Sequence, residues 1–181
     1  MNIFLHMEEK EGYVRANFSA HDVFSIDFLN ILIESCNIKY LTLPENFDQP
    51  IDNLVPGLKS LFVNQRYNQN LDNLPVGLEI LELGNYFNQP LDNLPSTLRE
   101  LNFRKSYNYR EYMKGKFNKS LDNLPQGLLF ISLYKNYELP LRNLPITIEK
   151  IEIFSDYPYL DELIGKHGES VVKILTDFRY K

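Results

Sequence analysis

The hydrophobic residues of this chain recur in columns that repeat along the sequence. The segment FNQPLDNLP at 87–95 returns with changes as FDQPIDNLVP at 47–56, YNQNLDNLP at 67–75, FNKSLDNLP at 117–125 and YELPLRNLP at 137–145. The aromatic residues that open successive copies are 20 residues apart, except for one interval of 30. Self-similarity at a fixed period is typical of repeat architectures, in which each unit is a structural building block.

Each unit closes with the pattern Leu-x-x-Leu-x-Leu or a close variant of it. Its last two apolar residues are two positions apart, so they point to one face of a strand. The proline of the Leu-Pro segment has no N–H to donate to a sheet, which predicts an irregular return arm there. The two strand columns are Leu41, Leu61, Leu81, Leu101, Ile131, Ile151 and Leu43, Val63, Leu83, Phe103, Leu133, Ile153.

A single unit cannot bury these columns, but stacked units can cover one another. We therefore predict an α+β repeat protein, a leucine-rich-repeat-like solenoid of about six coils. Its parallel sheet is expected on the concave face, with irregular arms on the convex side and helical caps at both ends. The return arms are too short for a full helix, so extended or 3₁₀ structure is expected in them.

The repeat resembles the FNIP repeat, which is named for Phe-Asn-Ile-Pro and occurs in slime moulds and in giant DNA viruses of amoebae. The resemblance is carried by Phe47-Asp48-Gln49-Pro50 and Phe87-Asn88-Gln89-Pro90, each followed by a Leu-Asp-Asn-Leu type segment, and it covers residues 38 to about 156. Three units are degenerate: Tyr67-Asn68-Gln69-Asn70, Phe117-Asn118-Lys119-Ser120 and Tyr137-Glu138-Leu139-Pro140. The resemblance implies a leucine-rich-repeat-like solenoid with a binding role and no catalytic residues.

The ends of the solenoid need caps, because an open end exposes both core and sheet edge. Residues 1–37 are interpreted as the N-terminal cap, with a hairpin from 2–7 and 13–18 and a helix from about 20 to 36 that begins after Ser19. Residues 38–156 form the solenoid. Residues 157–181 are interpreted as a C-terminal helical cap that Gly165 and Gly168 could split into two helices. All three parts are expected to form one domain.

The positions between the core columns are expected to face outward on the concave side, where solenoids bind. They vary from coil to coil, and several are aromatic, which suits an interface. The alternative is that these side chains cover one another and bind nothing. The candidate partner-binding residues on this face are Tyr40, Phe62, Asn64, Glu82, Asn102, Arg104, Phe130, Tyr134, Glu152 and Phe154.

The long interval contains an insertion, RKSYNYREYMKGK, at residues 104–116. Five basic residues against one acidic residue give it a net charge of +4 in a chain whose net charge is −5. Interleaved tyrosines and cations would suit an acidic protein partner or single-stranded nucleic acid. A tolerated surface loop is the alternative. The candidates here are Lys105, Tyr107, Tyr109, Arg110 and Tyr112.

Asparagine occupies one polar column in every complete unit, at Asn53, Asn73, Asn93, Asn123 and Asn143. Because an asparagine side chain both donates and accepts, we expect a structural ladder in which each amide bonds backbone groups of its own and the neighbouring coil. On this interpretation Asn93→Leu destabilises the fold by about 1–3 kcal/mol. The neighbouring aspartates, among them Asp72 and Asp92, are interpreted as solvated turn residues.

Three functional hypotheses remain open. The main one is a non-enzymatic cytoplasmic protein-binding module, in the host cytoplasm if the chain is viral, with no cofactor, metal site or membrane segment. The single cysteine, Cys36, allows no intramolecular disulfide and favours a reducing compartment. The second hypothesis is an adaptor that delivers a target to a host ubiquitin ligase through residues 1–37. The third is single-stranded nucleic-acid binding through residues 104–116, which the negative net charge disfavours. The oligomeric state stays open.

Overall fold

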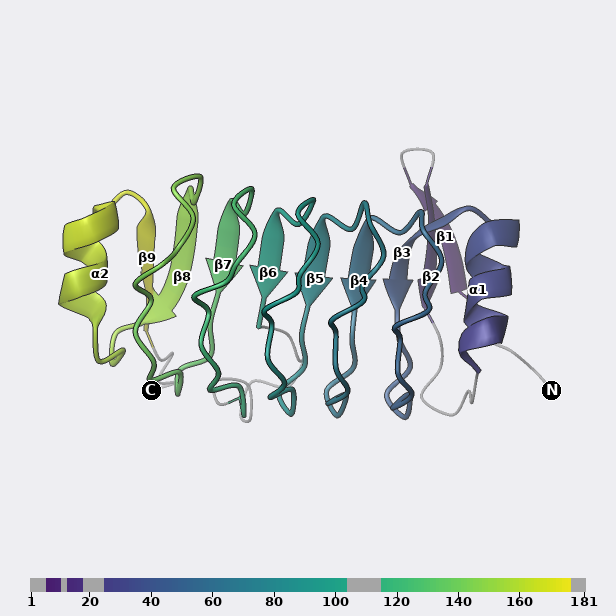
Figure 1. The fold of residues 1–181 in the computed structure, drawn as a ribbon, viewed down its shortest axis with the longest axis horizontal. Coiled ribbons are helices and arrows are strands. Elements are labelled where there is room, and N and C mark those ends of the chain that lie inside the picture. Colours follow the sequence, from purple (N-terminus) through teal and green to yellow (C-terminus); the bar gives the residue numbers. More distant parts are fainter. Residues whose placement is uncertain (1–5, 11–12, 18–24, 104–114, 177–181) are drawn as a thin grey trace, which may run out of the picture.

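The chain forms a single sheet whose strands follow one another in chain order (Figure 1). The computed structural model describes residues 6–10, 13–17, 25–103 and 115–176, and the sheet within them has nine strands. These are β1 (His6–Lys10), β2 (Tyr13–Asn17), β3 (Ile38–Thr42), β4 (Ser60–Phe62), β5 (Ile80–Glu82), β6 (Glu100–Asn102), β7 (Phe130–Ser132), β8 (Lys150–Phe154) and β9 (Val172–Leu175). Strands β1 and β2 are antiparallel, and every later neighbouring pair is parallel.

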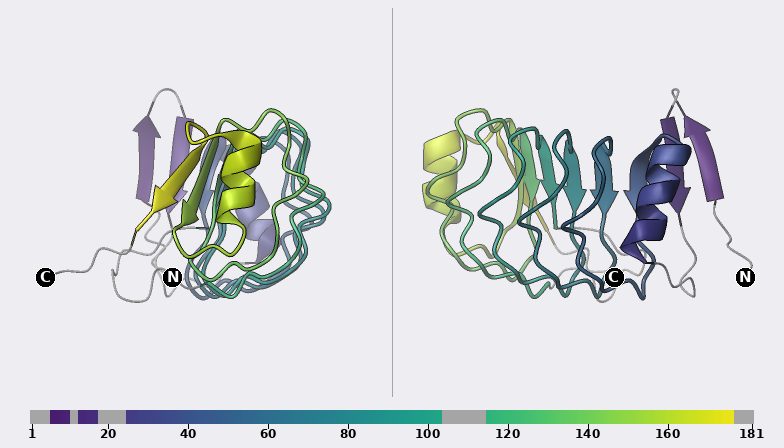
Figure 2. Two further views of the ribbon diagram at one scale, coloured as in Figure 1. Left: turned by 90° about the vertical axis from the view of Figure 1, so that its left-hand side faces the viewer. Right: turned by 45° about the vertical axis from the view of Figure 1, so that its right-hand side comes forward.

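The return arms carry the chain away from the sheet and back, so that successive coils stack side by side (Figure 2). The predicted leucine-rich-repeat-like solenoid is therefore confirmed. The middle residue of each short strand pairs in register with the next, as Leu41 does with Leu61 and Leu61 with Leu81, and all three are fully buried. Coils in register keep the apolar column continuous, which is why a unit that cannot form a core alone contributes to a shared one.

Two turns recur in most of the coils and shape the return arm. In the first turn, the aromatic residue that opens the unit donates its N–H to the carbonyl three residues before it, as in Phe87 N to Gly84 O at 3.1 Å. In the second, a leucine or isoleucine donates to a proline carbonyl, as in Leu98 N to Pro95 O at 3.0 Å. The complete arms in the described residues consist of turns and extended segments without 3₁₀ structure. The proline fits because it supplies only its carbonyl.

The opening aromatic residues form a buried column of their own. Phe117 stacks on Phe87 at 6.2 Å between ring centroids and on Tyr137 at 6.0 Å. Tyr137 stacks in turn on Tyr157 at 6.4 Å. The interplanar angles of these three pairs are 15° to 18°, the offset-stacked arrangement that aromatic pairs favour. The column continues across the longer interval, so the insertion does not disturb the stacking of the coils.

The N-terminal end is covered by the hairpin of β1 and β2 and by the helix α1 (Ile26–Ser35). The helix begins later than the expected residue 20, because Ser25 is its N-cap and its hydroxyl accepts from Phe28 N at 3.2 Å. Ser19 lies outside the described residues. Leu29 and Ile33 bury one face of the helix, and the Asn30 side chain bonds Asn53 O and Val55 N of the first return arm. These bonds satisfy backbone groups that the first coil would otherwise leave open.

The C-terminal end differs from the expected pair of helices. Within residues 157–176, which the structure describes, one helix forms, α2 (Leu160–His167), and it stops at Gly168, whose φ of 84° favours glycine. The following residues form β9, which pairs with β8 in parallel. The expectation of a second helix was wrong because the run Val171-Val172-Lys173-Ile174-Leu175 is rich in β-branched residues, which suit a strand. Helix α2 thus replaces a return arm, and β9 ends the sheet.

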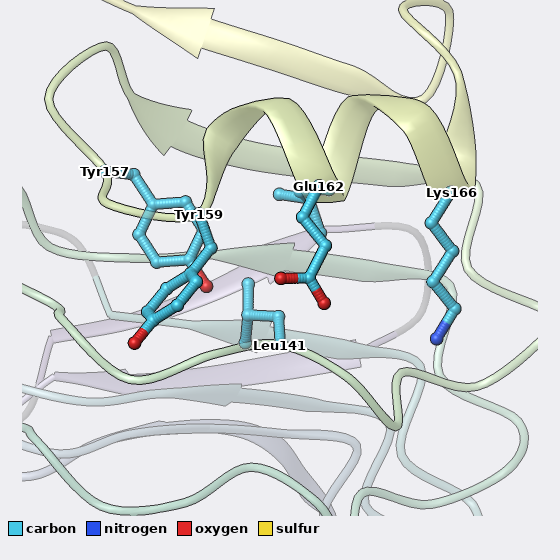
Figure 3. A pocket seen from close by; sticks show the side chains of 6 residues that line it. Leu141, Tyr157, Tyr159, Glu162 and Lys166 are labelled. Atoms are coloured by element: carbon cyan, nitrogen blue, oxygen red, sulfur yellow. The ribbon is translucent and has the colours of Figure 1, made fainter.

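A shallow pocket marks the joint between α2 and the last return arm (Figure 3). It is lined by Leu141, Tyr157, Tyr159, Glu162, Leu163 and Lys166. Two of its polar groups already form hydrogen bonds to backbone carbonyls of the last return arm. The Tyr157 hydroxyl donates to Leu139 O at 2.8 Å, and Lys166 Nζ donates to Arg142 O. The pocket is therefore a packing feature of the cap.

Candidate partner-binding face

The outward side of the sheet, here called the sheet face, is built from two rows of side chains that flank the core row. Strand register places them exactly one coil apart along each row. The first row is Tyr40, Ser60, Ile80, Glu100, Phe130 and Lys150, and the second is Thr42, Phe62, Glu82, Asn102, Ser132 and Glu152. Because Glu152 pairs with Lys173 of β9, the second row extends by one more residue.

Four of the sequence-predicted residues remain accessible on this face. Tyr40, Phe62, Asn102 and Phe130 are half-buried, so each presents part of its side chain to solvent. Exposed aromatic rings on a rigid sheet can anchor an interface, because little conformational entropy is lost when they bind. Ser60 and Ser132 are only 1% exposed between these larger neighbours. These four side chains therefore point outward as expected, whereas the smaller residues of the face are covered by their larger neighbours.

Glu82 and Glu152 lie on the face but are mostly buried, at 8% and 6% exposed. Glu152 Oε1 accepts hydrogen bonds from Lys150 Nζ and Lys173 Nζ, each at 2.9 Å. Burial alone would raise the pKa of Glu152, but the hydrogen bonds and charges of the two lysines outweigh it and hold the pKa below its usual value. Glu152 therefore organises two cations at the C-terminal end of the face.

The sequence analysis missed Lys173 because it placed residues after Gly168 in a helix. The β-branched run around it was the available signal for a strand. With β9 in place, Lys150 and Lys173 form a basic end of the sheet face.

Asn64 is buried, which contradicts its assignment to the exposed face. Its Nδ2 donates to Pro44 O at 2.8 Å and Phe47 O at 2.7 Å in the preceding coil. Its Oδ1 accepts from Arg66 N at 2.8 Å and Tyr67 N at 2.9 Å. The physical reason is that the chain turns back toward the core directly after each strand. A polar side chain at this position therefore satisfies turn backbone instead of facing a partner.

Tyr134 and Phe154 occupy the same position in later coils and are also buried, so they too leave the candidate surface. The Tyr134 hydroxyl donates to Leu83 O at 3.0 Å, two coils away in structure. Burial, with a smaller effect from the charge of Glu82, raises the pKa of Tyr134 above its ordinary value. Tyr134 also contacts the Phe103 ring at a centroid distance of 6.0 Å. Its ring packs against Gly115, where the described chain resumes.

The insertion candidates Arg104, Lys105, Tyr107, Tyr109, Arg110 and Tyr112 lie outside the described residues. The structure does describe the point at which the chain re-enters the solenoid. Gly115 N donates to Asn136 Oδ1 at 2.9 Å, and Asn136 Nδ2 donates to Gly115 O at 2.6 Å. A Cβ added at Gly115 would lie 2.0 Å from the Tyr134 ring, so glycine is required there. Sequence reasoning missed this clasp because its partners are separated by a coil.

The asparagine column lies on an exposed edge and bonds differently from the expected ladder. Asn93 Nδ2 donates to Asp72 Oδ1 at 3.0 Å. The same inter-coil bond recurs from Asn73 to Asp52, from Asn123 to Asp92 and from Asn143 to Asp122. The bonded acceptors are carboxylates of the preceding coil, so the aspartates are partners of the asparagines. Asn53 precedes the series, and its carbonyl accepts from Asn30. Each amide is exposed, which lowers the expected cost of losing it.

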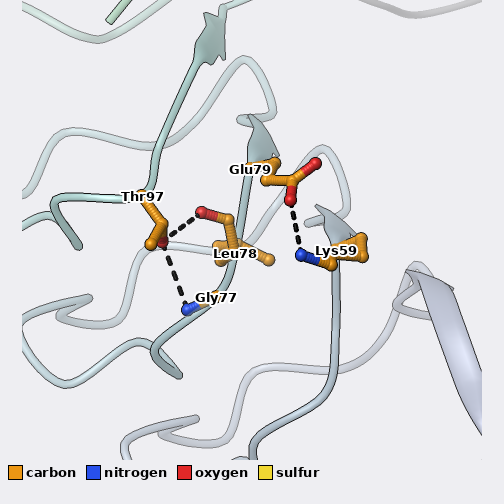
Figure 4. A network of polar contacts seen from close by, with 5 residues as sticks. All are labelled: Lys59, Gly77, Leu78, Glu79 and Thr97. Carbon is orange, nitrogen blue, oxygen red and sulfur yellow. Dashed lines mark hydrogen bonds and ion pairs between the residues drawn. The ribbon is translucent and has the colours of Figure 1, made fainter. Parts of the chain in front are cut away.

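Polar contacts between coils border the sheet face at the start of the strands (Figure 4). Lys59 forms an ion pair with Glu79 of the next coil. The Thr97 hydroxyl donates to Leu78 O at 2.8 Å and accepts from Gly77 N at 3.2 Å. These groups are committed to neighbouring coils, so they are not candidates for contact with a partner.

The described part of the chain contains no cluster of three or more His, Cys, Asp or Glu side chains that could hold a metal ion. Within the same ranges, no helix is both long enough and apolar enough to cross a membrane. Cys36 is a free, half-buried cysteine at the end of α1. The accessible chemistry of this surface is that of recognition by aromatic, carboxylate and ammonium groups.

Parallel strands from a repeated apolar motif, joined by irregular arms, define a leucine-rich-repeat-like solenoid. Within that class, residues 67–106 match the family described as FNIP Repeat, which confirms over these residues the resemblance seen in the sequence. Curated proteins give no match to the chain.

One similar solved structure is described as the crystal structure of CroV588, a novel circular LRR protein structure. The two chains share 20% sequence identity with a TM-score of 0.46. The similarity covers 83% of this chain and 28% of that chain, so this chain spans 28% of the length of the solved protein.

Proposed function

We propose that the chain is a non-enzymatic protein-binding scaffold that holds a protein partner against its sheet face. The observation that carries the proposal is the contrast between the core row and the two outer rows. The core row is leucine or isoleucine in β3 to β8, whereas the first outer row changes from tyrosine to serine, isoleucine, glutamate, phenylalanine and lysine. Stacking of the coils needs only the uniform row. The varied row supplies a surface specific to this chain.

The accessible aromatic residues are spread along the face. Phe62 lies on β4 and Phe130 on β7, with Tyr40 at the N-terminal end on β3. Neighbouring strands of a sheet are about 4.8 Å apart, so Phe62 and Phe130 lie about 14 Å apart across the strands. Because they belong to different rows, they are also offset by two residues, about 7 Å, along the strands. That separation matches an extended segment or a helix laid across the strands, with the two rings as anchors.

The test is an affinity pull-down from an amoebal lysate followed by mass spectrometry, with the intact chain and the double variant Phe62→Ala/Phe130→Ala as baits. The matched control is Val76→Ala/Ile146→Ala, which truncates two apolar side chains that are 73% and 95% exposed on the return arms. We expect a partner that the intact chain and the control retain and the face variant loses. Circular dichroism checks that both variants are folded.

A partner retained equally by all three baits would contradict binding through the sheet face. A fourth bait, in which residues 104–114 are replaced by one glycine, separates the face from the insertion. Loss of the partner only in this bait would move the function to the insertion.

A further inference from the structure

Charge is distributed unevenly along the sheet face on the two sides of β7. On one side, Lys150 of β8 and Lys173 of β9 share the single carboxylate of Glu152, and their side chains remain 47% and 57% exposed. Two ammonium groups against one carboxylate leave this end positive. On the other side lies the half-buried carboxylate of Glu100 on β6. Within the described ranges, no cation lies at ion-pair distance from Glu100.

The register of the strands makes this pattern self-complementary about β7. Glu100 and Lys150 are the direct neighbours of Phe130 in the first row, one strand to either side. In the second row, Asn102 and Glu152 are the direct neighbours of Ser132 in the same way. A two-fold axis that runs parallel to β7, above the face, exchanges the two sides and keeps each residue in its own row.

We propose that a second copy of this chain binds face to face across such an axis. The inference names a partner for the binding face and therefore rests on the proposed function. In the dimer, Glu100 of each copy faces Lys150 of the other. Phe130 meets its own counterpart on the axis, and Asn102 faces Glu152. A two-fold interface requires one patch to complement itself in this way.

The dimensions of packed sheets fit this arrangement. Facing sheets lie about 10 Å apart, a gap that two aromatic rings fill and that a lysine reaching toward a glutamate can span. Figure 1 shows β6, β7 and β8 side by side in the sheet, so these three strands of one copy can face the same three strands of the other. Three short strands make a small patch, so the association is expected to be weak and concentration-dependent.

The test is sedimentation velocity of the full chain at concentrations from about 10 µM to about 1 mM, the range that a weak interface requires. We expect reversible dimer formation that salt weakens, because the pairs are charged. Glu100→Lys and Lys150→Glu are each expected to weaken the dimer at least tenfold. The double variant Glu100→Lys/Lys150→Glu restores opposite charges across the axis and is expected to recover most of the affinity. Glu138→Lys, on an exposed turn of a return arm, is the matched control.

Each outcome decides the inference. A chain that stays monomeric throughout, a dimer that neither single variant weakens, or a double variant that stays as weak as the single variants would each overturn it. The neutral variant Glu100→Gln/Lys150→Gln, which keeps similar shapes, serves if a charge reversal unfolds the protein, and it must also weaken the dimer. A monomeric chain that still loses a foreign partner in the Phe62→Ala/Phe130→Ala variant would remove the dimer and leave the proposed function standing.

Discussion

The buried aromatic column contains three tyrosines whose hydroxyl groups have different surroundings. Tyr137 donates to Lys119 O at 3.2 Å, and Tyr157 donates to Leu139 O at 2.8 Å. Each acceptor is two residues after the opening aromatic of the preceding coil. The Tyr67 hydroxyl occupies the corresponding place but is buried without a hydrogen-bond partner. Tyr67 is 0% exposed, and the Ile51 backbone near its hydroxyl lies outside hydrogen-bond geometry.

Replacing each tyrosine with phenylalanine should therefore change stability in opposite directions. A buried hydroxyl without a partner costs about 1–3 kcal/mol, so Tyr67→Phe is expected to stabilise the fold by about 1 kcal/mol. Tyr137→Phe and Tyr157→Phe remove a hydrogen bond and leave a carbonyl unpaired, which costs about 1–2 kcal/mol each. Phenylalanine at the same position in other coils, such as Phe87, shows that the ring alone fills the site.

The assay is urea unfolding followed by circular dichroism, with thermal melts in parallel. A change of 1 kcal/mol corresponds to a melting-temperature shift of about 2–4 °C for a chain of this size. Tyr86→Phe is the matched control, because the Tyr86 side chain is 49% exposed. Removal of its hydroxyl group should change stability by less than about 0.5 kcal/mol. If Tyr67→Phe destabilises the chain as much as Tyr137→Phe does, the reasoning from the orphaned hydroxyl is refuted.

Three further predictions follow from the same structure. Asn64→Asp is expected to lower the free energy of unfolding in urea by about 3 kcal/mol, because a carboxylate cannot donate to the two carbonyls that Asn64 bonds. Asn93→Ala, on the exposed edge, should lower it by less than about 1 kcal/mol. Equal losses would contradict the assignment of Asn64 as the buried bridge between coils. Replacing residues 104–114 with one glycine should leave the melting temperature within about 4 °C of that of the parent chain. The reason is that Phe117 stacks on Phe87 and Tyr137, which holds the coils in register without the insertion. A loss of cooperative unfolding would contradict this prediction. Alkaline titration should destabilise the fold from about pH 10 upward, which is the unperturbed pKa of tyrosine. Burial raises the pKa of Tyr157 to about 12 and also raises those of Tyr67, Tyr134 and Tyr137, so the unfolded chain releases these protons at lower pH than the folded chain does. A tyrosinate absorbance that rises fully at pH 10 in the folded protein would contradict this prediction.

The sequence predicts the solenoid well because the repeat encodes it many times. Leu61, Leu81 and Leu101 recur at one position, and a period shared by every unit determines strand, register and stacking order together. The ends occur once and carry no such redundancy. The stripe from Leu160 to Leu175 suits a helix as well as a helix followed by a strand. The β-branched residues after Gly168 favour a strand, but the strand forms only because the edge of β8 is available for pairing.

The candidate site is harder to predict, because periodicity shows to which side of a strand a side chain points but not how deeply it is buried. Alternation places Phe62 and Asn64 on the same side of the chain, yet Phe62 stays accessible while Asn64 turns into the core. The difference comes from where the strand ends: β4 stops at Phe62, and the turn that follows needs acceptors and donors for its backbone. The ability of asparagine to donate and accept at once, expected for the exposed column, is used most fully at Asn64. Recurrence in the repeat therefore reveals the exposed asparagine column. Asn64, whose loss is expected to cost more stability, is recognised only from the turn that follows the strand.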